Sequence, residues 1–245
     1  AQLTDTIDIL RRLWAGESVI GHQGPAGSFP FLHQGADLDG APPILLVALG
    51  PRTHELAGAV ADGVVLHTFF SDDALRAAVA SVRRGAEQVG RDPALVRVWS
   101  VLATVGDHLD EEQQLRKLVG RMATYLQGYG DLLVRVNGWD PAVLARFRTH
   151  PVVTAATGAL DATASVDDLR ALSEAIPDEW LAAAARGTPE QCAAAVVDQF
   201  DLGADSVILH GATPSELAPV VDAYRQVRPV GIGERCAANP GRFVG

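Results

Sequence analysis

Short apolar runs alternate with longer amphipathic stretches along most of the chain. Four runs rich in β-branched residues predict buried strands, and they span residues 44–49, 63–67, 96–105 and 206–209. Apolar residues at helical spacing predict helices over residues 3–14, 54–61, 71–89, 189–203 and from 214 onward. Because each strand is followed by a helix, the pattern predicts β/α units and a parallel sheet with both faces buried.

Residues typical of helix ends predict where several of these helices begin and end. Ser71 is a predicted N-cap, and Gly90 ends the same helix. Thr-Pro-Glu-Gln at 188–191 and Thr-Pro-Ser-Glu at 213–216 are typical capping boxes with proline at the first helical position. The glycine- and proline-rich residues 17–42 predict a long loop, and residues 231–245 an irregular tail. We therefore expect one β/α domain over 1–230, with a helical insertion at about 107–187.

One sequence pattern occurs twice. Residues 61–67 and 204–210 both follow Ala-Asp-x-Val-x-Leu-His, and each copy ends with a histidine at the end of a predicted strand. In repeated β/α folds, ligands collect at the carboxyl ends of the strands. His67 and His210 are therefore candidates for lining a pocket, with packed, neutral histidines as the alternative.

Composition narrows the class of protein further. Thirty acidic against twenty basic residues give a formal charge of −10, which disfavours binding to a phosphate backbone, so we expect no nucleic-acid partner. No apolar run is long enough for a membrane span. Cys192 and Cys236 lie far apart, which favours a reduced, cytoplasmic protein. His22 and His33 lack the spacing of a metal site, and we predict none.

The segment after the first predicted strand has the features of an anion site. Gly50 permits a close approach to the backbone, Pro51 suits a helix start, and the helix dipole favours a negative charge. Arg52 and Thr53 could add a charged contact and a hydroxyl donor, or they could belong to an ordinary surface loop. The turn after His210 is a rival anion site, but its capping box already explains that sequence.

Several stretches together resemble the luciferase-like monooxygenase family. They are the helix and turn at 6–17, the strand and turn at 43–52, the Ala-Asp-Gly-Val at 61–64, the helix end at 85–93 and the Gly-Ala-Asp at 203–205. The resemblance implies the family's TIM (β/α)8 barrel, in which these segments correspond to strands five to eight. Strands one to four have no counterpart here, so we expect them upstream or in another polypeptide.

Within that family the sequence is most similar to members that use the deazaflavin coenzyme F420. The resemblance implies hydride transfer between F420 and a small organic substrate, with reduced FMN and a monooxygenase reaction as the alternative. A partner-binding remnant without catalysis is a third reading, and we expect a homodimer. No catalytic residue is identified. The residues that the resemblance assigns to the cofactor are Ala48, Leu49, Gly50, Pro51, Arg52, Thr53 and His67.

Overall fold

The central element is a sheet of parallel strands. A computed structural model describes residues 1–35 and 41–232, and the predicted tail lies largely outside them. The strands are β3 (Leu45–Val47), β4 (Gly63–Val65), β5 (Arg97–Gly106), β6 (Ala185–Gly187) and β7 (Ser206–His210). β4, β6 and β7 pair with β5, β3 pairs with β4, and every pairing is parallel. The four predicted strands and their direction are confirmed, whereas β6 was too short for the sequence pattern to reveal.

Four helices pack against one face of this sheet. They are α2 (Pro51–Val60), α3 (Asp72–Gln88), α11 (Pro189–Asp201) and α12 (Pro214–Val227). Val98 of β5 belongs to the core cluster that includes Leu75 and Val82 of α3, and Leu102 belongs to the cluster that includes Val196 of α11. Because strand residues an even number apart share a face, all four helices pack on the same side.

The opposite face of the sheet is open near its first strand. Leu45 is 37% exposed and Val47 74% exposed, although both are apolar strand residues. Trp99 and Val101 of β5 are only half-buried on the same face. The prediction that the first strand is buried on both faces is therefore wrong for the chain by itself. Near β3, helices cover only one side of the sheet, and the opposite side is the one that the resemblance implies to be the interior of a barrel.

The segment predicted as a long loop contains a β-hairpin instead. β1 (Val19–Gly24) pairs with β2 (Gly27–Leu32) antiparallel, and the pair lies beside α1 (Gln2–Trp14). Asp5 of α1 accepts hydrogen bonds from the Ala26 amide at 2.8 Å and from His22 at 3.0 Å. The Ala26 bond is the main cause of the lowered pKa of Asp5. Glycines and prolines obscured the strand pattern in the sequence. The hairpin is stabilised by contacts with α1, which is distant from β2 in sequence.

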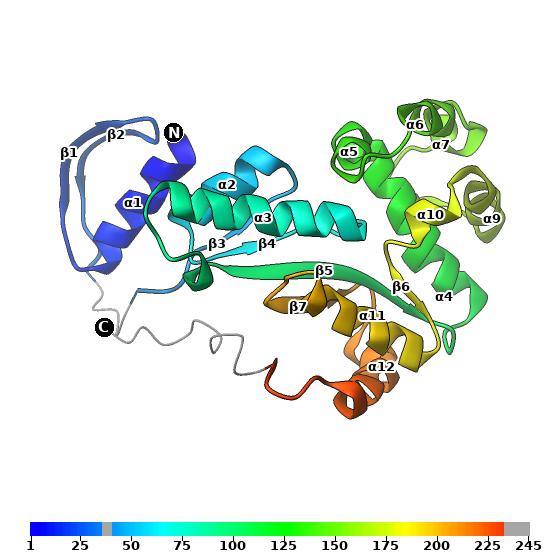
Figure 1. The fold of residues 1–245 in the computed structure, drawn as a ribbon. Coiled ribbons are helices and arrows are strands. Elements are labelled where there is room, and N and C mark those ends of the chain that lie inside the picture. Colours follow the sequence, from blue (N-terminus) through cyan, green and yellow to red (C-terminus); the bar gives the residue numbers. More distant parts are fainter. Residues whose placement is uncertain (36–40, 233–245) are drawn as a thin grey trace.

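The segment between β5 and β6 is helical, as predicted. It comprises α4 (Glu111–Leu115), the π-helical η2 (Arg116–Gly120), α5 (Arg121–Asn137), α6 (Pro141–Arg148), α7 (Pro151–Ala155), α8 (Leu160–Thr163), α9 (Val166–Ala175) and α10 (Asp178–Leu181). Figure 1 shows these helices at one end of the sheet and the β1–β2 hairpin at the other. Ala103 of β5 packs into their core beside Met122, so they cover the carboxyl end of the otherwise open face. No helix in the described ranges is long and apolar enough to cross a membrane.

The repeated Ala-Asp pattern has the same structural role in both copies. Asp62 accepts the Ile44 amide at 2.8 Å and an Arg11 N–H at 3.0 Å. Asp205 accepts the Val98 amide at 2.7 Å and an Arg83 N–H at 2.7 Å. Each aspartate therefore joins the start of its strand to the neighbouring strand and to a helix. Charge-assisted hydrogen bonds of this kind are stronger than neutral ones, which explains why the pattern recurs.

Candidate functional site

The two predicted histidines both lie at carboxyl ends of strands on the open face. His210 is the last residue of β7 and pairs with Ala103 of β5. His67 follows β4, and because Leu66 before it packs into the helix-covered core, His67 points to the opposite face. The predicted placement of both side chains at strand ends is confirmed. They stand on either side of β5, where the insertion helices begin to cover the sheet.

The hydrogen bonds of His67 determine its tautomer. The Thr68 carbonyl oxygen lies 2.9 Å from Nδ1, and a carbonyl can only accept. Nδ1 therefore carries the proton, and Nε2 of the neutral ring is an acceptor. Tyr129 Oη lies 2.9 Å from Nε2 and donates its proton to it. Burial lowers the pKa of His67, which keeps the ring neutral near pH 7.

Tyr125 and Tyr129 of α5 enclose the His67 ring. Both phenol rings meet it edge to face, each with a centroid separation of 4.9 Å. The two tyrosines are one helical turn apart, so their side chains share one face of α5. Burial raises the pKa of the Tyr129 hydroxyl, with Tyr125 adding to the effect, so the phenol stays protonated.

Two unusual backbone conformations flank this contact. Phe69, two residues after His67, has a φ of 62° although it is fully buried and not glycine. Tyr129 has φ −148° and ψ 34° inside a helix, and the π-helical η2 precedes that helix. Asn137 holds the first conformation by donating to the Phe69 carbonyl at 3.1 Å and accepting the Ser71 amide at 2.7 Å. Such conformations cost energy and concentrate at functional sites.

His210 has an unsatisfied polar atom close to this cluster. Its Nδ1 is buried and has no hydrogen-bond partner within the described residues. Burial lowers the pKa of His210, and repulsion from the charge of Arg121 lowers it further. Arg121 itself lies in an ion pair with Asp161, with an N–O distance of 3.1 Å. A buried, neutral imidazole nitrogen without a partner is costly, which indicates a place where a ligand could hydrogen-bond.

The predicted anion turn joins β3 to α2 as the sequence suggested. Gly50 is the N-cap, Pro51 is the first helical residue, and the first turn has no acidic residue. The amides of Thr53 and His54 both donate to the Gly50 carbonyl at 3.0 Å, and proline has no amide hydrogen. Within the first turn of α2, the Arg52 amide therefore remains as a donor, together with the side chains of Arg52 and Thr53. Ala48 is buried, Leu49 packs against the insertion core, and Arg52 is exposed.

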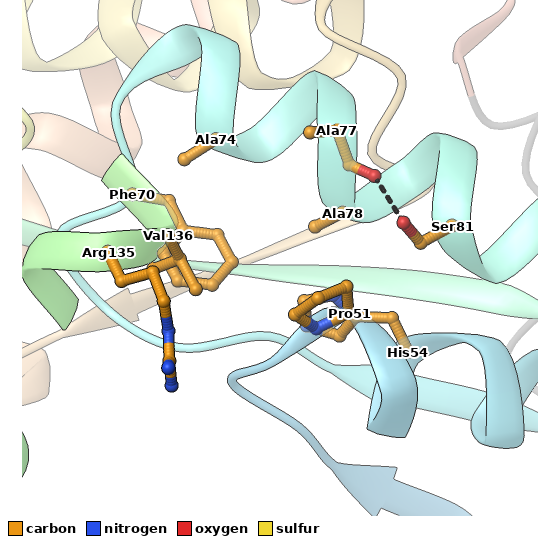
Figure 2. A pocket seen from close by; sticks show the side chains of 9 residues that line it. All are labelled: Pro51, His54, Phe70, Ala74, Ala77, Ala78, Ser81, Arg135 and Val136. Atoms are coloured by element: carbon orange, nitrogen blue, oxygen red, sulfur yellow. Dashed lines mark hydrogen bonds between the residues drawn. The ribbon is translucent and has the colours of Figure 1, made fainter. Parts of the chain in front are cut away.

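A cavity of about 240 Å³ adjoins this turn on its helix side. Figure 2 shows Pro51 and His54 of α2 facing Ala77 and Ala78 of α3, with Arg135 of α5 to one side. His54 is 3% exposed, and burial lowers its pKa. Arg52 does not line this cavity. The cavity therefore does not support a role for Arg52 in cofactor binding, and that role stays a prediction.

Other sequence-based expectations can be compared with the structure. The Thr213 side chain accepts a hydrogen bond from the Glu216 amide, so the turn after His210 is a helix cap. This agrees with the sequence analysis, which explained the turn by its capping box. Cys192 is fully buried in the core. In the described part of the chain no group of histidine, cysteine and acidic residues could hold a metal. His22 forms a hydrogen bond to Asp5, and His33 is exposed and lies within hydrogen-bond distance of Ser18.

The sequence analysis did not identify Tyr125 and Tyr129 as residues of the candidate site. The structure places both tyrosines against His67, while other residues of the same helix pack in the core of the insertion. Tyrosines at 125 and 129 have the i, i+4 spacing of one helix face, and this was the available signal. Arg121 and the conformation of Phe69 had no such signal, because both depend on contacts with distant segments.

Comparisons with known proteins agree with this geometry. A 5,10-methylenetetrahydromethanopterin reductase of Methanolobus tindarius is 27% identical over 209 residues, which cover 83% of this chain and 58% of the reductase. The structure resembles that of a coenzyme F420-dependent tetrahydromethanopterin reductase from Methanopyrus kandleri, with a TM-score of 0.64, 17% identity, and coverage of 88% of this chain and 58% of that chain. An F420-dependent secondary alcohol dehydrogenase in complex with an F420-acetone adduct gives a TM-score of 0.58 at 14% identity, covering 91% of this chain and 59% of that chain.

The chain thus spans less than two thirds of the length of these relatives. Its parallel sheet matches their barrel-type fold over about that share, as the resemblance to strands five to eight implied. The family described as luciferase-like monooxygenase matches residues 1–206. The chain therefore belongs to the luciferase-like monooxygenase family.

Proposed function

We propose that this chain forms the carboxyl-terminal part of an F420-dependent oxidoreductase that acts on a small organic substrate. Support comes from a family of flavin- and deazaflavin-dependent oxidoreductases and from relatives described as F420-dependent. The observation that carries the proposal is the convergence of His67, His210 and the Gly50 turn at the carboxyl edge of one sheet. That edge is where barrels of this type place their ligands.

The residues at this edge fit such a cofactor. The start of α2 offers a positive helix end without acidic residues, which suits a phosphate group. The guanidinium of Arg52 and the hydroxyl of Thr53 would add charge-assisted and neutral hydrogen bonds. His210 Nδ1 is a buried polar atom that lacks a partner within the described part of the chain. When bound, a deazaflavin would supply hydride chemistry, and the protein would supply orientation and electrostatics.

A binding titration tests the assignment of the turn. We expect F420 to bind this chain, and Arg52→Ala to weaken that binding about tenfold, the typical effect of losing one charge-assisted hydrogen bond. Arg76→Ala is the matched control, because Arg76 is exposed and pairs only locally with Asp73. Fluorescence of the deazaflavin would follow the binding.

FMN provides the decisive comparison. Tight binding of FMN without binding of F420 would reject the proposal in favour of a flavin-dependent monooxygenase. An equal loss of affinity in both arginine variants would reject the turn as the phosphate site. Binding of neither cofactor would reject cofactor use by this chain and favour the partner-binding reading.

A further inference from the structure

One face of α3 carries only small side chains where it lies opposite the start of α2. Its members follow the i, i+3, i+4, i+7 spacing of a single helix face, and they are Ala74, Ala77, Ala78 and Ser81. Side chains of this size leave the space between the two helices unfilled, and the cavity of about 240 Å³ is the result. We call these four residues the small face of α3.

The cavity is enclosed by segments of this chain alone. Figure 2 shows the small face of α3 on one side and α2 on another, with Phe70, Arg135 and Val136 completing the walls. It therefore needs no other polypeptide to form, in contrast to the open face of the sheet. Neither His67 nor His210 lines it, so it is separate from the edge that we propose for the cofactor.

His54 brings a hydrogen-bonding group into this largely apolar wall. Its Nε2 lies 3.4 Å from the Ala48 carbonyl oxygen, and because a carbonyl can only accept, Nε2 carries the proton. Nδ1 is then an acceptor, and it has no hydrogen-bond partner among the described residues. The side chain is 3% exposed, and burial lowers the pKa of the ring, which keeps it neutral near pH 7. A ligand that meets Nδ1 must therefore bring a neutral O–H or N–H group.

The charge around the opening favours an anion. Arg135 is exposed, and its guanidinium forms no hydrogen bond or ion pair with another described residue. No acidic residue lines the described cavity, although the whole chain has a formal charge of −10. Pro51 brings the positive end of the α2 dipole to the same wall. An ammonium group would be repelled here, whereas a carboxylate could pair with Arg135 and keep its contact with water.

The size and the apolar walls favour an aromatic ring. A protein cavity of about 150 Å³ can hold a benzene molecule, so this larger cavity can hold a benzene ring with two small substituents. Phe70 already meets the His54 ring edge to face, with a centroid separation of 6.1 Å. A ligand ring between them would extend this aromatic contact and would also pack against Val136.

We propose that this cavity is a second ligand site and that it binds a small phenolic carboxylic acid. The phenol hydroxyl donates to His54 Nδ1, the ring packs against Phe70 and the small face of α3, and the carboxylate pairs with Arg135 at the opening. The inference does not depend on the proposed cofactor, because the two sites share none of the residues assigned to ligand contacts.

The first test uses the unmodified chain with labelled alanine methyl groups and 4-hydroxybenzoate as the probe. We expect saturable NMR shifts at Ala74, Ala77 and Ala78, and none at Ala80, an exposed alanine of α3 outside the cavity. The nitrogen-15 signal of His54 Nδ1 should move as well. The absence of saturable shifts, shifts that include Ala80 equally, or an unchanged Nδ1 signal would overturn the proposal.

The second test removes one ligand group at a time. Benzoate lacks the hydroxyl and phenol lacks the carboxylate, and each should bind about fivefold or more weakly than 4-hydroxybenzoate, as the loss of one polar contact would give. Benzoate should leave the His54 Nδ1 signal unchanged. Equal affinity of 4-hydroxybenzoate and benzoate, or of 4-hydroxybenzoate and phenol, would overturn the proposal.

An arginine variant tests the contact at the opening. Arg135→Gln should weaken 4-hydroxybenzoate about fivefold and leave the affinity for phenol unchanged, because phenol has no carboxylate. Arg146→Gln, an exposed arginine of α6 outside the cavity, is the control and should leave both affinities unchanged. An equal loss in both variants, or a loss that extends to phenol, would overturn the assignment of Arg135.

A cavity-filling variant tests the location. Ala77 is exposed at the rim, so Ala77→Leu can extend into the cavity without a buried helix contact being replaced, and it should abolish binding of all three probes. Ala80→Leu on the same helix is the control and should retain binding. Unchanged binding in Ala77→Leu would overturn the proposal. If circular dichroism shows that this variant does not fold, the methyl shifts of the unmodified chain still decide the location.

Discussion

Asn137 shows how one side chain can hold a strained segment. It donates to the Phe69 and Leu133 carbonyls and accepts the Ser71 amide at 2.7 Å, so it connects the end of α5 to the loop after β4. Phe69 has a φ of 62°, which is unfavourable for a bulky residue. The same loop carries His67. The position of the candidate site therefore depends on an amide side chain 70 residues away in sequence.

We expect Asn137→Ala to lower the free energy of unfolding by about 2–3 kcal/mol, because it leaves the Ser71 amide and the Phe69 carbonyl without this partner. Urea unfolding followed by circular dichroism would measure the change. Gln127→Ala, an amide in the same helix, is the control and should change stability by less than about 0.5 kcal/mol. A loss below that value for Asn137→Ala would contradict the bracing role.

The helices α2 and α3 pack with their backbones in close contact at two glycine residues. A methyl group at Gly85 would overlap the Glu55 carbonyl, and one at Gly58 would overlap the Val82 carbonyl. The two helix backbones can therefore approach each other only where both helices lack a Cβ atom. This close approach positions α2, whose first turn is the predicted phosphate site, against the sheet.

Gly85→Ala should lower stability by about 3 kcal/mol, because the added methyl group meets main-chain atoms that cannot move aside. Gly128→Ala is the matched control. Gly128 is exposed in α5 with nothing within 4 Å of an added Cβ atom, so this change should raise stability by about 0.5–1 kcal/mol. Thermal and urea unfolding of both variants would show whether the signs differ. Equal effects would refute the close helix contact.

At the scale of the molecule, Glu216 connects the last helix to the insertion. Its carboxylate accepts the Thr213 amide at 2.6 Å, Lys117 Nζ at 3.0 Å and Gln113 Nε2 at 3.2 Å. The first of these bonds is the largest cause of a pKa lowered from 4.5 to about 2. A carboxyl group whose pKa is lower in the folded state stabilises that state only when it is ionised.

The contribution of Glu216 should therefore be complete above about pH 4.5 and disappear as the pH falls toward 2. We expect Glu216→Gln to be less stable than the unmodified chain near pH 7 and to approach it at acid pH. Glu87→Gln, an exposed residue of α3, is the control. Urea unfolding at a series of pH values would provide the comparison. A difference that does not change between pH 7 and 2 would contradict the assignment.

The same scale explains the limits of sequence-based prediction. Four of the sheet's strands, their parallel direction and three helix caps were predictable from the sequence. The strands and the caps at Ser71, Thr188 and Thr213 depend on residues adjacent in sequence, and the parallel direction follows from the alternation of strands and helices. The β1–β2 hairpin was missed because Gly21 and Pro30 interrupt its alternation. The open face around Val47 was also missed, since an apolar run indicates burial without naming what covers it.

The sequence by itself determined the order of β/α units, the ends of the main helices, the family and the placement of His67 and His210 at strand ends, because hydrophobic period and capping are local properties. Only the tertiary structure decided that Tyr129, 62 positions further along the chain, lies against His67 and that Thr68 fixes the ring's proton. It also decided that one face of the sheet stays uncovered near its first strand. Hydrogen-bond direction and burial depend on which distant segments meet, and local patterns carry no information about such contacts.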